Sequence, residues 1–200
     1  WPGNNEQMVR YHDEEWGVPC HDDRKLFEYI VLDTFQAGLS WAIVLKKREG
    51  FRQAFENFDP TKIASYVIND VQRLENNPEI IRNKLKIAAT VTNAQAFLKI
   101  QKEFGSFDKY IWGFVYSEQS RGVKGRAFDS AQAKPIVNSP KEDSHIAASS
   151  EESDAMSIDL KKRGFKFVGT TICYAFMQGA GLVNDHTVNC FRYNELTNGN

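Results

Sequence analysis

The sequence has 200 residues, of which 42% are hydrophobic and 26% charged, and its formal net charge is −1. This length and composition are typical of one soluble globular domain with a core large enough to fold without disulfides. No apolar run is long enough to span a bilayer, which excludes a membrane protein. The balanced charge excludes a generally basic nucleic-acid-binding protein, so any such contact must be made by local basic patches.

The cysteines point to a reducing compartment. Cys20, Cys173 and Cys190 are an odd number and lie far apart in the chain. This pattern predicts reduced thiols in a cytoplasm, and no secretory signal is visible. The sequence opens at Trp1 and not at a methionine, so we expect further residues upstream of it in the complete protein. Nothing in the composition requires an oligomer, and we expect a monomer.

Helical signals begin near residue 22. Either Asp22 or Asp23 can cap a helix whose apolar side chains recur three or four positions apart and form one stripe. After Asp33, the apolar run over residues 37–45 predicts a buried helix that ends in a basic, exposed turn. No stretch alternates with a period of two for long enough to be a sheet strand, so we predict an all-α fold.

Further helix starts follow along the chain. Asp59 is an N-cap signal with Pro60 at the first helical position, and Asn69 begins another candidate helix. The longest periodic segment runs from about residue 79 to residue 104, where we expect one apolar face to be buried. The members of that face are Ile81, Leu85, Ala88, Val91, Ala94 and Leu98. Ser106 can cap the short helix that follows.

The periodic pattern lapses between residues 116 and 148. Gly, Ser, Lys and two prolines replace the apolar stripe there, which predicts a long connecting segment. A capping-box pattern from Ser149 to Glu152 then starts a helix that should stop at Gly164. We expect a single domain over residues 1–200, with no internal repeat.

Residues 160–180 are predicted to form two helices joined by a short link. Thr170 or Thr171 can cap the second helix, whose free backbone N–H groups would point outward at its positive end. A glycine in such a link lets a phosphate approach closely, and lysines beside it add positive charge. The candidate DNA-contacting residues are Lys162, Gly164, Lys166, Gly169 and Thr170. On spacing alone, an ordinary helical corner explains the pattern more often.

Longer stretches of sequence resemble a known family. The string LKKRGFKFVGTTICY at residues 160–174 and its continuation to His186 closely resemble the helix-hairpin-helix segment of the 3-methyladenine DNA glycosylase I family. YHDEEWGVP at residues 11–19 and QAGLSW at residues 36–41 agree with the same family. The resemblance covers nearly the whole chain and is weakest between residues 116 and 148. It implies a helix-hairpin-helix enzyme of the bacterial cytoplasm that acts on double-stranded DNA with alkylated bases.

A metal site is the next implication. His186 and Cys190 lie four residues apart, so one helical turn could present both to one metal. A core histidine and a buried free cysteine are the more common origin of such a pair. The resemblance implies a structural zinc that joins the N- and C-terminal segments, with ligands at His12, His186 and Cys190. Its fourth ligand is a cysteine two residues before the position of Trp1. We therefore expect a tetrahedral zinc in the complete protein.

The resemblance also implies a pocket for the damaged base. Aromatic faces attract a positively charged methylated adenine, and a carboxylate can accept a hydrogen bond from its exocyclic amine. On pattern alone, the tryptophans would be assigned to core packing. The resemblance assigns base binding to Tyr11, Trp16 and Trp41, extends it to Trp1, and makes Asp33 the catalytic, purine-reading carboxylate.

Asp33 is where this sequence departs from the family. The family usually has glutamate in a Leu-Glu-Gly context, whereas this chain has Leu32, Asp33 and Thr34. The side chain is shorter by one methylene, about 1.5 Å of reach, which is enough to lose a direct hydrogen bond unless the backbone or a water compensates.

The expected chemistry needs little acid–base help. An N3-alkylated adenine departs as a neutral molecule, so positioning can supply much of the rate. Asp185 is the candidate carboxylate near the hairpin, but the resemblance implies that the family does without it, and we expect it to support the metal-binding His186. No lysine stands out as a Schiff-base nucleophile, so we expect a monofunctional enzyme that uses water and leaves the strand intact.

Three alternatives stay open. The first is a family member with altered lesion specificity, prompted by Asp33 and Thr34. The second is a non-catalytic helix-hairpin-helix protein that only binds DNA, which would have no need of the aromatic residues or Asp33. The third is a zinc-stabilised scaffold, which would leave the basic residues of the hairpin unexplained.

Overall fold

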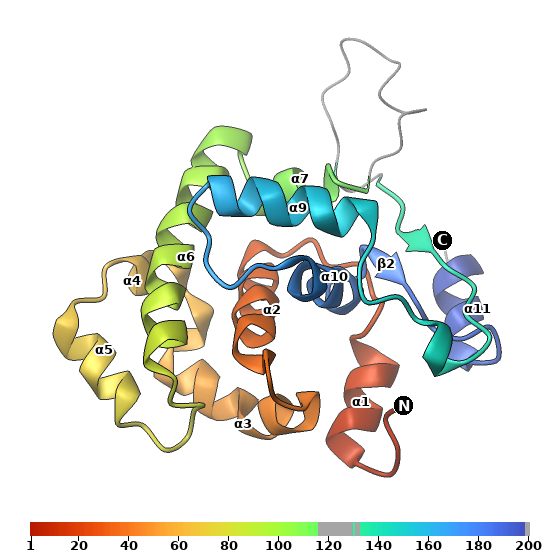
Figure 1. Ribbon diagram of the computed structural model, residues 1–200, viewed down its shortest axis with the longest axis horizontal. Coiled ribbons are helices and arrows are strands. Elements are labelled where there is room, and N and C mark those ends of the chain that lie inside the picture. The colour runs from red at the N-terminus through yellow and green to blue at the C-terminus, as the bar shows by residue number, and fades with distance from the viewer. Residues whose placement is uncertain (116–129, 131–132, 199–200) are drawn as a thin grey trace.

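The computed structural model describes residues 1–115, 130 and 133–198, which form helices packed around a central helix, α2 (Figure 1). The α-helices are α1 (Glu6–Glu14), α2 (Asp23–Gln36), α3 (Trp41–Ala54), α4 (Pro60–Ala64), α5 (Ile68–Glu75), α6 (Lys84–Phe104), α7 (Phe107–Trp112), α9 (Glu151–Lys162), α10 (Thr170–Gly179) and α11 (Phe191–Asn198). Short 3-10 turns in the described loops include η1 (Glu56–Phe58) and η3 (Asp143–His145). In the described parts of the chain, no helix is long and apolar enough to cross a membrane.

The prediction of an all-α fold is confirmed. In the residues described, strand pairing is confined to β1 (Ile136–Val137) and β2 (Val183–Asn184), which run parallel. This short ladder ties the segment before α9 to the segment after α10. Helices α1 and α11 lie on the same side of the molecule, so the two ends of the chain approach each other (Figure 1).

The core forms around α2. All ten residues from Leu26 to Phe35 are buried, because α3, α6, α7 and α10 surround the helix. Aromatic rings fill the contacts: Phe27 packs edge-on against Phe97 of α6, with ring centroids 4.9 Å apart. On the other side, Phe35 packs on Phe51 of α3 at 4.7 Å. Asp33, near the end of α2, is therefore held by a rigid element.

Several helix starts match their capping signals. Asp22 caps α2 by accepting from the backbone N–H of Lys25 at 2.7 Å. Asp59 caps α4 with Pro60 at the first helical position, and Ser106 caps α7. These predictions are confirmed because each depends on a contact within one turn of the chain.

Other starts were predicted a few residues away from where they lie. The helix expected from Asn69 begins at Ile68, because Asp70 reaches back to the backbone N–H of Val67 at 3.0 Å. The capping box expected at Ser149 is formed by Ser150 with Ser153. The longest helix begins at Lys84 and not near residue 79, because the side chain of Asn83 caps it.

The prediction of a buried helix over residues 37–45 is wrong in its first half. Residues 37–40 form a turn in which Gly38 has φ 86°, and α3 begins only at Trp41. A left-handed residue cannot continue a right-handed helix. The turn leaves Leu39 exposed, and Ile43 in the first turn of α3 is exposed as well.

The apolar face predicted for α6 is only partly correct. Ala94 is buried as expected, but Leu85 is 72% exposed and Ala88 lies at the surface. The other buried apolar residues of the helix include Ile87, Phe97 and Ile100. Apolar residues occur on two faces of this helix, so spacing alone did not distinguish them. The buried face is the one that carries Phe97, because the Phe97 ring packs against Phe27 of α2 and Phe107 of α7.

About half of the predicted connection over residues 116–148 lies outside the described residues. Residues 116–129 and 131–132 are not described, and of the remainder, residues 133–148 carry β1 and η3 between loops. This part runs along β2 and leads into α9. The prediction of a single domain stays a prediction.

Candidate functional site

A cavity of about 240 Å³ opens between α1, α2, α3 and α10. All five residues predicted for base binding and catalysis line it. They are Trp1, Tyr11, Trp16, Asp33 and Trp41. The structure thus brings together side chains that are separated by up to forty positions in the sequence, and it places them in one hollow.

Sequence reasoning missed five further lining residues. They are Met8, Gln36, Ile146, Ala175 and Gln178. Gln36 was within the QAGLSW block, and Gln178 follows the hairpin string, so both lay inside stretches that resemble the family. Ile146 comes from the irregular segment before α9, which had no signal in the sequence. Helix α10 therefore contributes to the cavity as well as to the hairpin.

Aromatic rings form the walls of the cavity. Trp1 and Trp16 pack edge to face with centroids 5.1 Å apart, and Tyr11 is tilted against Trp41 at 5.2 Å. Tyr11 and Trp16 are buried and Trp1 is exposed, so Trp1 lies at the rim and the others lie deeper. A flat, aromatic or cationic ligand suits such walls.

Unpaired polar groups are the second feature of the cavity. Asp33 is only 5% exposed, yet its carboxyl group accepts no hydrogen bond from any residue that the structure describes. The buried Trp41 indole N–H likewise lacks a partner among the described residues. Buried polar groups without partners are uncommon and call for an explanation. A ligand that supplies the missing partners is one.

Burial changes the acidity of these groups. It raises the pKa of Asp33 well above its ordinary value of 3.8. Burial, and next the nearby Asp33 carboxyl, also raise the pKa of Tyr11. A cation entering the cavity would favour the ionised form of Asp33 and reverse its shift, so the site is poised to bind positive charge.

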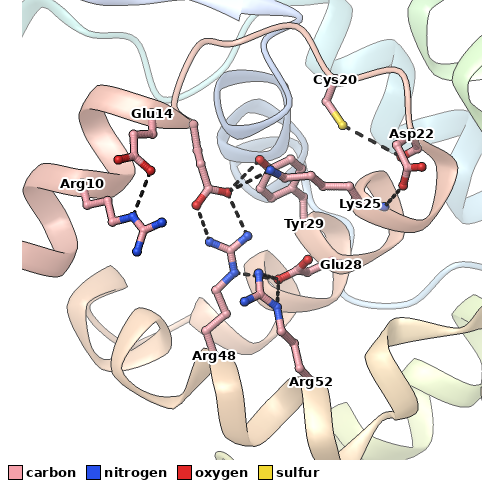
Figure 2. Close-up of polar contacts among 10 residues, drawn as sticks. Arg10, Glu14, Cys20, Asp22, Lys25, Glu28, Tyr29, Arg48 and Arg52 are labelled. Atoms are coloured by element: carbon pink, nitrogen blue, oxygen red, sulfur yellow. Dashed lines mark hydrogen bonds and ion pairs between the residues drawn. The ribbon is translucent and has the colours of Figure 1, made fainter.

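A network of ion pairs fixes the helices that carry the cavity walls (Figure 2). Arg48 of α3 donates to both carboxylate oxygens of Glu15, at 2.7 and 2.9 Å, and through Nε to Glu28 of α2 at 2.6 Å. Burial opposes the ionisation of Glu15, but the hydrogen bonds and charge of Arg48 outweigh it and hold the pKa of Glu15 at about 2. Glu15 directly precedes Trp16, so Arg48 ties the end of α1 to α2 and α3.

The three predicted metal ligands lie together. Cys190 Sγ is 3.6 Å from His12 Nε2 and 3.5 Å from His186 Nδ1, and all three ligand atoms lie within 4.8 Å of one another. A tetrahedral zinc with a Zn–S distance of about 2.3 Å and Zn–N distances of about 2.0–2.1 Å requires S···N separations of roughly 3.5 Å. The donor set and its spacing therefore fit zinc.

The second nitrogen of each histidine has its own partner. His12 Nδ1 lies 2.7 Å from an Asp13 carboxylate oxygen, and His186 Nε2 lies 3.0 Å from the carbonyl oxygen of Trp16. Such contacts fix the ring orientation that a metal ligand needs. The prediction that Asp185 supports His186 is wrong. The carboxylate of Asp185 accepts hydrogen bonds from Asn138, Tyr174 and Gln178 instead.

The hairpin has the predicted helix–turn–helix shape. Gly164, with φ 99°, ends α9, and Gly169 is the N-cap of α10. The predictions that Thr170 or Thr171 caps α10 are wrong, since Thr170 is already its first helical residue. No atom lies within 4 Å of the Cβ position at Gly169, so the N-terminus of α10 is open to an approaching group.

Charge and internal contacts complete the hairpin. Lys162 and Lys166 are exposed and form no ion pair with any described residue, whereas the neighbouring Arg163 is bound to Glu103 at 2.7 Å. The backbone of Lys166 is held by Asn93 of α6, which accepts from its N–H at 2.7 Å and donates to its carbonyl oxygen at 3.1 Å. Sequence reasoning missed Asn93, which is far from the hairpin in the chain.

Comparisons with known proteins agree over nearly the whole length. The family model described as methyladenine glycosylase matches residues 1–193. DNA-3-methyladenine glycosylase 1 from Escherichia coli (strain K12) is 46% identical over 193 residues, covering 96% of this chain and 95% of that protein. DNA-3-methyladenine glycosylase from Haemophilus influenzae is 44% identical over 190 residues, covering 95% of this chain and 94% of its own length.

Solved structures show the same fold. A crystal structure of a 3-methyladenine DNA glycosylase I is 46% identical with a TM-score of 0.85, covering 96% of each chain. The Staphylococcus aureus enzyme, whose structure is described as the basis of 3-methyladenine recognition, is 33% identical with a TM-score of 0.84, covering 94% of this chain and 92% of its own. The match in family model, sequence and fold is consistent, and the chain belongs to the methyladenine glycosylase family.

Proposed function

We propose that this protein is a monofunctional DNA glycosylase that hydrolyses the N-glycosidic bond of 3-methyladenine in alkylated double-stranded DNA. The observation that carries the proposal is the aromatic cavity with the buried, unpaired carboxyl of Asp33. The names of the relatives support the same substrate.

The cavity supports a simple mechanism. The extruded base lies between the aromatic walls, where its positive charge is attracted by the ring faces. Asp33 accepts a hydrogen bond from the exocyclic amine, and the cationic base shifts Asp33 towards its ionised form. The base leaves as a neutral molecule, so holding it in place lowers the barrier without a strong acid.

The surroundings support hydrolysis by water. No lysine is among the residues that line the cavity in the described part of the chain, so the site offers no amine for a Schiff base. The Asp185 carboxylate already accepts hydrogen bonds from Asn138, Tyr174 and Gln178. These donors occupy it, which argues against a role as general base.

The hairpin is the proposed DNA contact. Backbone N–H groups at the start of α10, next to Gly169 and Thr170, would bind a phosphate, with Lys162 and Lys166 adding charge and Gly164 shaping the link. Helix α10 runs from this point to Ala175 and Gln178 in the cavity. One rigid element therefore sets the position of the phosphate relative to the base.

The test is release of free 3-methyladenine from methylated duplex DNA. We expect release by the wild type, with the rate reduced about 10- to 100-fold in Asp33→Asn, because asparagine keeps an acceptor oxygen but loses the negative charge that attracts the cationic base. Trp41→Ala should also lower the rate of release, because it removes one of the aromatic rings that line the cavity. Glu14→Gln, at an exposed position, is the control. No release by a folded, DNA-binding wild type would reject the enzymatic function.

A second candidate specificity is favoured by Asp33 itself. The shorter side chain leaves more room beside Trp41 than glutamate would. The matched variant Asp33→Glu restores the usual residue of the family. If the chain prefers lesions other than 3-methyladenine, Asp33→Glu should shift the preference towards 3-methyladenine in the same release assay.

We also propose that His12, His186 and Cys190 hold a structural zinc, with the cysteine expected two residues before Trp1 as fourth ligand. When bound, the zinc would join the end of α1 to the segment before α11. Trp1 packs on His12, with ring centroids 5.5 Å apart, so residues just before it would lie near the site.

Metal analysis of the complete protein should find one zinc per chain, and Cys190→Ser should lose it. A chelator should lower the melting temperature of the wild type and leave that of Cys190→Ser unchanged, because only the first has metal to lose. Cys20→Ser, at the other partly exposed cysteine, is the control and should keep its zinc. A preparation without stoichiometric zinc would reject the site.

A further inference from the structure

Gln178 connects the base cavity to a buried carboxylate. It lines the cavity from α10, and Asp33 lines the same cavity from α2. Its Nε2 donates to Oδ2 of Asp185 at 2.7 Å. Asp185 is 2% exposed and lies just after β2, so it cannot shift without disturbing the core.

Asp185 determines which end of the Gln178 amide faces it. A carboxylate only accepts hydrogen bonds, so it selects the NH₂ end of the amide. Two further donors hold the carboxylate in place: the Tyr174 hydroxyl at 2.8 Å and Asn138 Nδ2 at 2.7 Å. The carbonyl Oε1 of Gln178 is left free, and it accepts no hydrogen bond from any residue that the structure describes.

We propose that Gln178 determines the purine preference of the cavity, and that Asp185 is the positioning residue that makes its amide an acceptor. The proposal rests on the function proposed above. The exocyclic amine of 3-methyladenine carries two hydrogens. Asp33 accepts one of them from the α2 side, and Oε1 of Gln178 accepts the other from the α10 side.

The same arrangement disfavours 3-methylguanine. That base carries an oxygen where 3-methyladenine carries the amine, so its oxygen would face the Oε1 acceptor of Gln178. Two facing acceptors leave both unpaired once the base is bound, and buried groups without partners are costly. Because Asp33 is shorter than the glutamate usual in the family, Oε1 of Gln178 should contribute more to binding the exocyclic amine.

Asp185→Asn removes the constraint on the amide. In the wild type, Oδ1 accepts from Asn138, whereas Oδ2 accepts from both Tyr174 and Gln178. Asparagine has one acceptor oxygen and one NH₂ group in their place, so it can pair with either end of the Gln178 amide and no longer keeps Oε1 directed at the cavity. We expect the affinity for free 3-methyladenine, relative to 3-methylguanine, to fall about tenfold.

The experiment is a titration of each variant with the two free bases, followed by tryptophan fluorescence, with the melting temperature measured in parallel. Gln178→Met removes the amide and should lower the same ratio. Tyr174→Phe is the control: it removes another hydrogen bond from the same carboxylate, so it can lower stability but should leave the ratio unchanged.

Unchanged ratios in both Asp185→Asn and Gln178→Met would overturn the proposal, as would an equal loss in Tyr174→Phe. Because binding is measured without bond cleavage, the result is separate from the proposed activity. A wild type that binds 3-methyladenine without releasing it from DNA would contradict the activity alone. A wild type that binds neither base would contradict both.

Discussion

Helix α2 carries two buried carboxyl groups with opposite surroundings. Glu28 is 8% exposed and accepts hydrogen bonds from Arg48 at 2.6 Å and Arg52 at 3.1 Å (Figure 2). Asp33, at 5% exposure, accepts none from the described residues. The same helix thus holds one carboxylate that is paired with arginines inside the protein and another that is free for a ligand.

The difference separates two kinds of buried charge. In the network of Arg48 with Glu15 and Glu28, desolvation is offset by paired charges, and the result is a fixed position for three helices. In the cavity, desolvation at Asp33 is not offset, so its raised pKa reflects a cost that a cationic base can relieve. Pairing therefore indicates a structural role here, and its absence indicates a binding role.

The largest expected effect comes from breaking the paired region. Arg48→Met leaves the partly buried Glu15 and the buried Glu28 without their main partner, and we expect the free energy of unfolding to fall by about 3–5 kcal/mol. Urea denaturation measures this. Arg10→Met removes the exposed partner of Glu14 and is the control, with no measurable loss expected. Equal stability of Arg48→Met and wild type would show that the network does not hold the helices.

A smaller effect is expected at the unpaired carboxyl. Because burial raises the pKa of Asp33 above 3.8, the folded protein keeps its proton to a higher pH than the unfolded chain does. Stability should therefore fall as pH rises above 3.8 towards the folded-state pKa, by at most about 1.4 kcal/mol per pH unit.

Asp33→Asn lacks this group, so its stability relative to wild type should increase over the same pH range. Asp33→Glu keeps a carboxyl there and should retain the slope. Urea denaturation at a series of pH values provides the comparison. Parallel curves for wild type and Asp33→Asn would contradict the unpaired state of Asp33.

The smallest effect is expected from the basic residues of the hairpin, which also include paired and unpaired side chains. Lys162 and Lys166 are unpaired among the described residues, whereas Arg163 is bound to Glu103 and Asp159. Lys162→Gln and Lys166→Gln should each reduce the slope of log affinity for duplex DNA against log salt by about 0.9. Arg163→Gln should lower stability and leave that slope unchanged. Fluorescence anisotropy at several salt concentrations distinguishes them.

The sequence by itself determined the local features of this protein. The caps at Asp22, Asp59 and Ser106 and the helix stop at Gly164 could be predicted, because each depends on contacts within a few residues. The five cavity residues and three metal ligands came from the resemblance to a family, and the structure brings each set together.

Only the tertiary structure decided which groups are paired. The buried face of α6 and the partners of Asp185 depend on segments distant in the chain, as does the contact of Asn93 with Lys166. A carboxyl group in the sequence has the same chemistry whether or not an arginine twenty residues away reaches it. Packing decides whether that contact forms. A buried carboxyl group that is paired, such as Glu28, stabilises the fold, whereas an unpaired one, as we propose for Asp33, can bind a base.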